Sequence, residues 1–437
     1  MTLPAETLPP RFSLVAKLFN ARAGEVPALL LSFGFFFCVL CGYYILRPIR
    51  DESGVLLGTQ FISYAFSATF VVMFAAVPAF GWLVANVSPR RIVPIVYAVV
   101  LAVLGVFWAL LEFEKSNVYV AGAFFVWVNV FVLFVVSLFW SCMAEIWTSD
   151  QGKRLFGVIS VGGACGALTG PALIQGLVRA IGVANLLLVS AGFLALGLGF
   201  YFALRNLAGA TKQKTDSDVA ERSGALAGAI NVWKSPYLFR IGAWTLAGTF
   251  FGVYFYLEQA RVVGGAFQDQ TDRVEMLARI ETGVSALTMF FELFVTGRLM
   301  QAIGVGRAMA IGPICAVIGI VAVAVAPGVA MIATIMVVTR GLDYGMTGPA
   351  SRVLYTIVDE RDKDRAQSFN DTIVYRGGSA SITWIYNAIA TAAKSAGMAA
   401  APLITVFAVP LALAWAWLSL DLGVRHDREA KGKRAPR

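Results

Sequence analysis

The sequence is poor in histidine, cysteine and charged residues, and each scarcity narrows the range of functions. The single histidine, His426, gives no support for a His-ligated metal site or a histidine proton relay. The five cysteines lie in or beside apolar segments without the pairing pattern of a secreted disulfide framework, so we interpret them as packing residues. No Gly-x-x-x-x-Gly-Lys phosphate loop occurs, which argues against an ATP-driven pump. Because no nucleophile–base pair or metal-ligand set is visible, we expect neither an enzyme with catalytic residues nor a bound metal or cofactor.

Apolar residues dominate the chain instead. Of its 437 residues, 58% are hydrophobic and only 14% are charged, and the mean hydropathy is +0.74. Runs of about 20 apolar residues, long enough as helix to cross about 30 Å of hydrocarbon, recur along nearly the whole sequence. Only helices satisfy every backbone amide within a bilayer in such short segments. The sequence therefore predicts an all-α membrane protein with twelve transmembrane helices.

The predicted spans form two sets of six, separated by a polar stretch. The first set is Val26–Leu46, Phe61–Ala85, Ile92–Leu111, Val118–Trp140, Leu155–Val178 and Val183–Leu204. The second set is Leu238–Tyr256, Ile280–Met300, Ala308–Ala326, Val329–Pro349, Phe369–Ala390 and Met398–Leu420. We therefore expect an N-terminal segment (1–25), a first six-helix half (26–204), a linker (205–237), a second half (238–420) and a basic tail (421–437).

Basic residues gather on one side of this topology. That side holds both termini, the pairs Arg90-Arg91 and Lys153-Arg154, the linker and the tail from Arg425 to Arg437. By the positive-inside rule both termini should be cytoplasmic. The net charge of +9 then serves topology and contact with anionic lipid, so nucleic acid is not an expected partner.

Two glycine-containing motifs each occur twice in the sequence, with nearly the same separation between the copies. Gly81-Trp82-Leu83 closes the second span, and Gly297-Arg298-Leu299 closes the eighth, 216 residues later. Gly162-Gly163 lies in the fifth span and Gly377-Gly378 in the eleventh, 215 residues later. A duplicated six-helix unit around a central cavity is the plan of the major facilitator superfamily. Gly81-x-Leu83 followed by Arg90-Arg91 also resembles the cytoplasmic signature of that superfamily, with Ala85 at its acidic position.

Charged motifs at the helix ends carry a narrower resemblance. Taken together and in this order, they resemble the bacterial and plastid ATP/ADP translocase family over most of the chain. The matching elements are Leu46-Arg47 with Arg50-Asp51, Phe139-Trp140 with Glu145, Lys153-Arg154-Leu155-Phe156, and Arg365 with Asp371 and Tyr375-Arg376-Gly377-Gly378. The resemblance implies nucleotide exchange across a bacterial inner membrane. The lysine expected after the arginine-glycine pair in the nucleotide-carrying branch is replaced by Ser379.

The charges within the spans are the candidate site residues. Placing a charged group in hydrocarbon costs several kcal/mol, roughly 2.5–3.5 on insertion scales. Such a group is therefore expected only where it forms an ion pair, contacts water or has a function. Arg340 and Asp343 lie three residues apart and should share a helical face. Glu145 is expected to latch onto Lys153 or Arg154. The expected substrate-binding residues are Arg47, Arg50, Arg340 and Arg376, and the expected gating or ion-pairing residues are Asp51, Glu145, Arg154, Glu258, Asp343 and Asp371.

These observations predict a secondary transporter that moves an organic anion by alternating access. Its expected partners are a small anionic solute of the nucleotide type and membrane lipid, and we expect a monomer. Two alternatives remain open. One is a proton-coupled transporter of another solute or amphiphile, and the other is a membrane sensor or assembly protein that does not transport.

Overall fold

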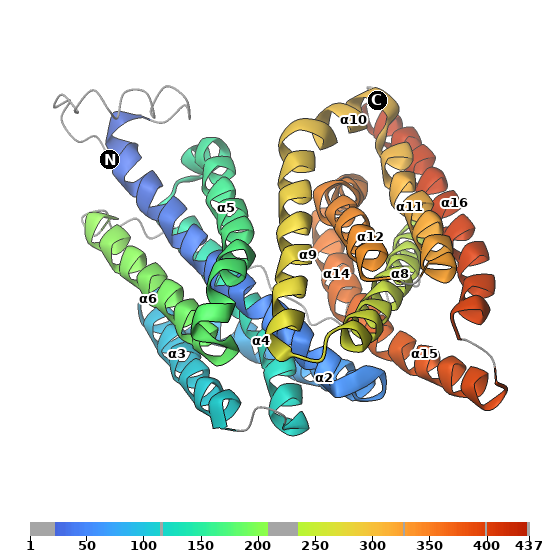
Figure 1. Cartoon of the computed structure of the whole chain (residues 1–437). Helices are drawn as coiled ribbons and strands as arrows, with labels where there is room; N and C mark the ends of the chain where they lie inside the picture. The colour runs from blue at the N-terminus through green and yellow to red at the C-terminus, as the bar shows by residue number, and fades with distance from the viewer. Residues whose placement is uncertain (1–21, 114–116, 209–234, 327, 398–399, 435–437) are drawn as a thin grey trace. The chain divides into compact units, whose positions relative to one another are not determined.

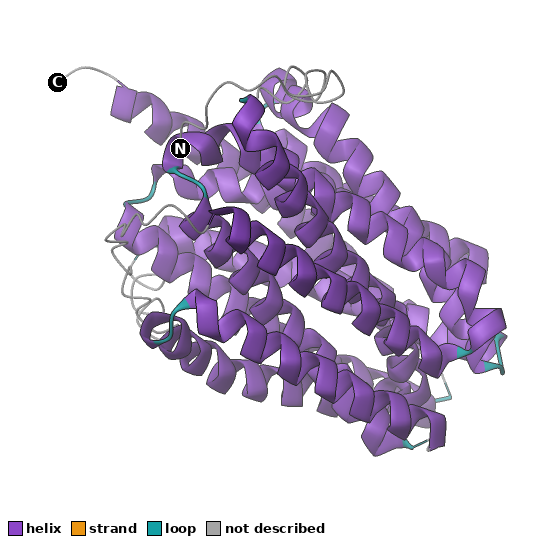
Figure 2. Ribbon diagram, turned by 90° about the vertical axis from the view of Figure 1, so that its left-hand side faces the viewer, coloured by secondary structure: helices purple, strands orange, loops and turns teal. Residues whose placement is uncertain are grey.

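The computed structural model describes residues 22–113, 117–208, 235–326, 328–397 and 400–434. Within these residues all regular secondary structure is helical, and only short loops join the helices (Figure 2). The all-helical prediction is therefore confirmed over the described part of the chain. Most of the expected N-terminal segment and linker lies outside the described residues.

The first half of the sequence folds into long helices that match the first six predicted spans. They are η1 (Ala23–Glu25), α2 (Val26–Asn86), α3 (Pro89–Phe113), α4 (Val118–Ile146), α5 (Ser149–Ile181) and α6 (Val183–Ala208). The first two predicted spans are thus one run of helix, and the stretch between them is helical as well. The chain breaks direction inside α2 at Gly58, which has φ 71° and ψ 164°. Glycine adopts this conformation readily because it has no Cβ. Gly58 therefore separates the first two predicted spans without a loop.

The helices of the second half are interrupted more often. In order they are α8 (Pro236–Ala266), α9 (Gln270–Phe290), η2 (Phe291–Val295), α10 (Thr296–Ile303), α11 (Val305–Val325), α12 (Val329–Leu342), η3 (Asp343–Thr347), α13 (Gly348–Val353), η4 (Leu354–Ile357), α14 (Glu360–Phe369), η5 (Asn370–Gly377), α15 (Gly378–Ser395) and α16 (Ala400–Arg434). The segments η2, η3 and η5 are π-helical. Such turns are rare and are frequently found at functional sites.

Ten helical segments of the described residues are long and apolar enough to cross a membrane. The count differs from twelve for two reasons. The first two predicted spans share α2, and the eleventh is divided among α14, η5 and α15. The polar residues of η5 lower the hydropathy of that eleventh segment.

The chain divides into two compact units. Unit 1 contains the described residues of 1–50, 79–120 and 127–219, and unit 2 contains those of 51–78, 121–126 and 220–437. The division passes through α2 between Arg50 and Asp51, so the second part of this helix packs with the helices of unit 2.

Close helix contact at glycines organises unit 1. A Cβ on Gly162 would lie 2.6 Å from the carbonyl oxygen of Phe33, and a Cβ on Gly170 would lie 2.7 Å from that of Cys41. Small residues let helix backbones approach in this way. The face of α5 that carries Gly162 and Gly170 is therefore the surface against which α2 packs.

The same use of glycine appears in unit 2. A Cβ on Gly306 of α11 would lie 2.8 Å from the Cα of Gly423 in α16, and Figure 1 shows these two helices side by side. Gly378, in the predicted eleventh span, meets Leu246 of the predicted seventh span, as Gly163 of the fifth meets Phe36 of the first. The second glycine of each of these pairs thus lies against a side chain of the first helix of its own half.

Candidate functional site

The charged run of α2 is distributed over both units. Arg47 is 8% exposed, and its guanidinium lies 5.4 Å from the centre of the Tyr44 ring. Arg50 donates a hydrogen bond from Nη1 to the amide oxygen of Asn129 in α4, 3.1 Å away. Both arginines belong to unit 1, whereas Asp51, which is 4% exposed, belongs to unit 2.

Glu52, the next residue of α2, forms a buried ion pair with Arg273. It is 1% exposed and accepts hydrogen bonds from Arg273 Nη2 at 2.9 Å and Arg273 Nε at 3.3 Å. Gln270 Nε2 donates to its other oxygen at 3.1 Å. Arg273 also donates to the carbonyl oxygens of Gln268 and Phe267, at the turn between α8 and α9. The sequence did not indicate the pairing of Glu52 with Arg273, which lies 221 residues away.

Glu145 has a different partner from the one expected. Its carboxylate lies 3.4 Å from both terminal nitrogens of Arg205, in the last turn of α6. Arg205 also donates to Tyr201 OH at 3.2 Å. The predicted latch to Lys153 or Arg154 is therefore wrong, because the C-terminal end of α6 places a guanidinium nearer to Glu145.

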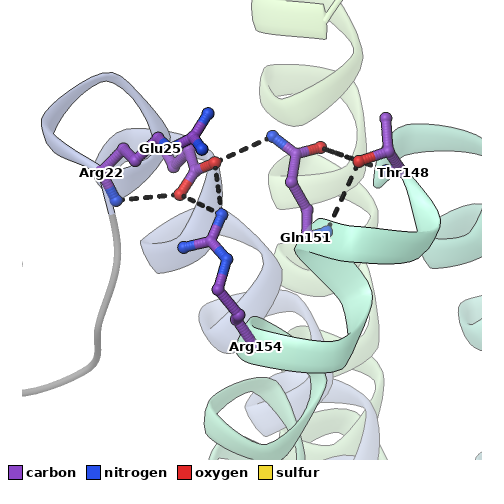
Figure 3. A network of polar contacts seen from close by, with 5 residues as sticks. All are labelled: Arg22, Glu25, Thr148, Gln151 and Arg154. Carbon is purple, nitrogen blue, oxygen red and sulfur yellow. Dashed lines mark hydrogen bonds and ion pairs between the residues drawn. The ribbon is translucent and has the colours of Figure 1, made fainter.

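Arg154 instead pairs with Glu25 at the start of α2 (Figure 3). Arg154 Nη2 lies 3.0 Å from Glu25 Oε1, and the same oxygen accepts a hydrogen bond from Gln151 Nε2 at 3.0 Å. The amide of Arg22 donates to the second carboxylate oxygen at 2.9 Å. Gln151 also closes the capping box of α5 with Thr148. The network fixes the first turn of α2 against the first turn of α5.

This network determines the charge state of Glu25, which lies just before the first span. Burial alone would raise the pKa of Glu25, but hydrogen bonds from the Arg22 amide, Gln151 and Arg154, with the charge of Arg154, outweigh it. The pKa of Glu25 is therefore lowered from its ordinary value, and the ionised form is favoured.

Glu258 of α8 lies at the centre of a hydrogen-bonded cluster with Arg261 and Tyr386 in unit 2. Its side chain is almost fully buried and accepts from Arg261 Nη2 at 2.6 Å and from Tyr386 OH of α15 at 2.7 Å. One carboxylate therefore links α8 to α15 while the Arg261 side chain remains half exposed. Glu258, expected to be a gating or ion-pairing residue, is thus paired with Arg261 in this structure.

Arg340 is engaged by Glu281 of α9. Its Nη2 donates to the two carboxylate oxygens at 2.8 and 3.0 Å, and the Glu281 side chain is 2% exposed. Close packing surrounds the pair, since a Cβ on Gly341 would lie 2.7 Å from Leu287 and one on Gly283 would lie 2.8 Å from Val337. Arg340, expected to bind substrate, thus holds α12 against α9 through a partner that the sequence did not indicate.

Asp343 opens η3, one turn after Arg340. Its side chain is exposed although it lies within a membrane-spanning segment. A carboxylate facing lipid at that depth is too costly, so exposure of this kind indicates a water-filled path. A π-turn at Gly345 brings the backbone close to η2 and to the start of α10, where Thr296 donates a hydrogen bond to the Gly345 carbonyl at 2.5 Å.

Asp371 and Arg376 both lie in η5, and the structure leaves them accessible. Asp371 is exposed and Arg376 half-buried. The Arg376 guanidinium lies 5.7 Å from the centre of the Tyr375 ring and acts electrostatically on Asp371. Ser379, where the resemblance implies a lysine, is 5% exposed and donates to the Tyr375 carbonyl at 2.7 Å, so it brings no cation to this region.

The described residues contain no group of three or more His, Cys, Asp or Glu side chains that could hold a metal ion. The accessible groups within the spans are instead guanidiniums and carboxylates. Guanidiniums bind phosphate or carboxylate through paired hydrogen bonds. Nearby carboxylates can compete for them or carry protons. The arrangement is thus suited to reversible binding of charged solutes.

Comparison with known proteins gives the family. The profile of the Major Facilitator Superfamily matches residues 35–382. No curated protein matches the chain by sequence. A solved structure of a mutant of the nucleoside transporter NupG superposes with a TM-score of 0.63 at 12% identity, covering 90% of this chain and 99% of that one. The POT family transporter PepTSo gives a TM-score of 0.64 at 12% identity, covering 92% and 98%.

A third solved structure is a bacterial homolog of the human lysosomal transporter Spinster. It has a TM-score of 0.56 at 12% identity and covers 93% of this chain and 99% of that chain. At such identities these likenesses concern the fold alone. The profile match extends over most of the sequence and agrees with the helical architecture and the apolar spans. The chain is therefore a multi-pass membrane protein that belongs to the major facilitator superfamily.

Proposed function

We propose that this protein is a secondary transporter that moves an organic anion by alternating access. The observation that carries the proposal is the exposure of the Asp343 carboxylate within a membrane-spanning segment; Asp371, at the start of the predicted eleventh span, is exposed as well. Charges that face lipid are strongly disfavoured, whereas charges that line a water-filled solute path are typical of transporters. The π-turns that carry both carboxylates support the same interpretation.

The anionic character of the solute follows from the arginines. Arg50 donates a hydrogen bond to the Asn129 amide oxygen, and the guanidiniums of Arg47 and Arg376 lie over tyrosine rings. A guanidinium binds carboxylate or phosphate with geometric specificity. We place Arg47, Arg50 and Arg376 among the groups that meet the solute, and Arg340 among the groups that hold the helices around it.

Among organic anions, the resemblance to ATP/ADP translocases favours phosphorylated solutes. The absence of a lysine at Ser379 favours a broader organic anion over strict ATP/ADP exchange. One of the solved structures with this fold is a nucleoside transporter and another belongs to the POT family, so the fold alone does not choose the solute.

Gating is proposed to use the ion pairs at the helix ends. Glu145 and Arg205 lie near the C-terminal ends of α4 and α6, and Glu25 and Arg154 lie near the N-terminal ends of α2 and α5. By the distribution of basic residues, we propose that these helix ends and both termini are cytoplasmic. We also propose that the protein works as a monomer in a bacterial inner membrane. Glu52, the partner of Arg273, lies near the middle of α2, after the first predicted span. Different pairs would form and break as the conformation changes.

The test is uptake of labelled ATP into proteoliposomes, with and without internal ADP, for the wild-type chain and for Arg376→Ala. Arg298→Ala is the matched control, since Arg298 is an exposed arginine of α10 outside the proposed path. Uptake that depends on internal nucleotide and on Arg376 would establish an anion exchanger. If folded wild-type protein takes up neither ATP nor small phosphorylated or carboxylate solutes, the anion-transport proposal is wrong.

A second candidate is a proton-coupled transporter of another solute. The exposed carboxylates Asp343 and Asp371 favour it, because water-accessible carboxylates within a membrane can carry protons. Uptake driven by an imposed pH gradient, without internal solute, would distinguish this function from exchange. A membrane sensor would show neither form of uptake.

A further inference from the structure

Four charged side chains of unit 2 lie near one another without direct ion pairs. They are Glu292 of η2, Arg352 of α13, and Asp371 and Arg376 of η5. Arg352 acts electrostatically on both Glu292 and Asp371, and Arg376 acts on Asp371. Within the described part of the chain, none of the four makes an ion pair or a side-chain hydrogen bond. The charges thus alternate in sign while every group remains available to a solute.

The π-helical backbone aligns two of these groups. Hydrogen bonds in a π-helix join residue i to residue i+5, so Asp371 and Arg376 lie one turn apart on one side of η5. In an α-helix of about 3.6 residues per turn, residues five apart would point about 140° away from each other. The local change of helix type therefore brings the carboxylate and the guanidinium together.

Two hydrogen bonds place Arg352 beside them. Asn370 Nδ2, at the start of η5, donates to Tyr355 OH of η4 at 2.5 Å, and Tyr237 OH of α8 donates to the Leu354 carbonyl at 2.9 Å. Arg352 lies one turn before Tyr355, and Asp371 directly follows Asn370. Asn370 is 3% exposed, and its buried Oδ1 has no hydrogen-bond partner among the described residues. The short segment with Arg352 is thus fixed against the beginning of η5.

Exposure then indicates what the group can bind. Arg352, Asp371 and Glu292 are exposed, and Arg376 is half-buried. With both carboxylates ionised, the two arginines are neutralised, so an incoming anion must replace a carboxylate. Both guanidiniums act electrostatically on Asp371, whereas only Arg352 acts in this way on Glu292.

We propose that Arg352 and Arg376 form a two-guanidinium site for the anionic group of the transported solute, with Asp371 as the resident counter-ion that the solute displaces. The site rests on the proposed function and adds Arg352, which no sequence pattern marks. A phosphate or carboxylate group accepts hydrogen bonds from both guanidiniums when Asp371 turns away or takes up a proton from water. When the solute leaves, the proton returns to water and the Asp371 carboxylate again neutralises the two arginines.

The proposal predicts a definite pH response. Helices α8, α14 and α15 pack against η5, and the titratable or charged groups that act on Asp371 are Arg352, Arg376 and Tyr355. Protonation of Asp371 removes the competing negative charge. Anion binding should therefore strengthen as the pH falls, and Asp371→Asn should bind tightly at every pH.

The experiment is calorimetric titration of the purified full-length protein in detergent with ATP, inorganic phosphate and the neutral nucleoside adenosine. Arg352→Ala should weaken binding of the anions about 10- to 100-fold, the loss of one charge-assisted contact, and should leave adenosine unaffected. Asp371→Asn should tighten anion binding about tenfold at pH 7.5 and abolish its pH dependence. Arg298→Ala and Asp150→Asn are the matched controls, because both residues are exposed and lie outside the site.

The two proposals fail in different ways. If the wild-type chain binds or transports anions and Arg352→Ala matches Arg298→Ala, the two-guanidinium site is wrong and the transport proposal stands. If Asp371→Asn weakens anion binding, Asp371 is not a competitor and the site is also wrong. If the wild-type chain neither binds nor transports any anion, the proposed function itself fails. Because Asp371→Asn should increase affinity, a misfolded variant cannot imitate the expected result.

Discussion

At the scale of single residues, the charged side chains fall into two groups. Glu25, Glu52, Glu258 and Glu281 are buried and bonded to arginine, whereas Asp343 and Asp371 are exposed within the spans. A buried carboxylate that loses its cation becomes an uncompensated charge, which destabilises a protein strongly. The first group therefore maintains helix contacts, and the second is available for solutes.

Glu25 should contribute stability that depends on pH. Its pKa is lowered from the ordinary 4.5, so the contribution is fully present above pH 4.5 and is lost as the pH falls through the lower pKa of the folded protein. We expect Glu25→Gln to lower the melting temperature at pH 7, and the difference from wild type to shrink below pH 4.5.

Thermal unfolding in detergent between pH 7 and pH 3 measures this effect. Asp150→Asn is the control, because Asp150 lies beside Gln151 in the first turn of α5 but is exposed. Its melting temperature should differ little from that of the wild type at any pH. A Glu25→Gln difference that grows on acidification would contradict the assignment.

At the scale of elements, glycines decide which helices touch. Along α5, Gly162, Gly166 and Gly170 face the backbone of α2, whereas Gly157 and Gly176 face open space. The sequence shows the glycines but not which of them lie in the contact. The spacing of four residues in the first group is the part of the pattern that indicates helix packing.

Gly166→Ala should destabilise the protein and Gly176→Ala should not. A Cβ on Gly166 would overlap the Phe37 carbonyl and lie 2.9 Å from the Cys41 amide nitrogen, which must force the helices apart. Overpacking of this kind costs about 1–3 kcal/mol. At Gly176 nothing lies within 4 Å, so alanine there gains up to about 1 kcal/mol of helix propensity.

Melting temperatures of the two variants compare the same substitution within one helix. We expect opposite signs relative to wild type. Equal changes would show that α5 does not lie against α2 through Gly166.

At the scale of the whole molecule, Glu52 and Arg273 join segments that are far apart in the sequence. The pair lies in unit 2, where Arg273 also closes the turn between α8 and α9. An alternating-access cycle requires such contacts to form in one state and break in another. We infer that this pair biases the conformational equilibrium.

Charge exchange tests that role. Glu52→Arg and Arg273→Glu should each reduce transport, because each leaves two like charges together, and the double exchange should restore part of it. Uptake by proteoliposomes with matched protein content is the measurement. If the double variant is as impaired as the sum of the single variants, the pair does not act as a unit.

Much of the fold could be predicted from the sequence, whereas the partners of the charges could not. Over the described residues, nearly all of each span predicted from hydropathy is helical, because membrane insertion depends on local composition. Local composition also marked Arg340 and Glu145 as charges that need a partner. It did not reveal Glu281 or Arg205, since partners on other helices depend on how the helices pack.

The sequence by itself determined that the chain is an all-helical, multi-pass membrane protein built from two related halves. These properties follow from the length of apolar runs and from repeated glycine pairs, which are visible in one dimension. The tertiary structure alone decided where helices turn to π geometry, that Gly58 bends α2, and that Arg352 lies beside Asp371. The physical reason is that such features depend on contacts between distant segments, whose energies no local pattern records.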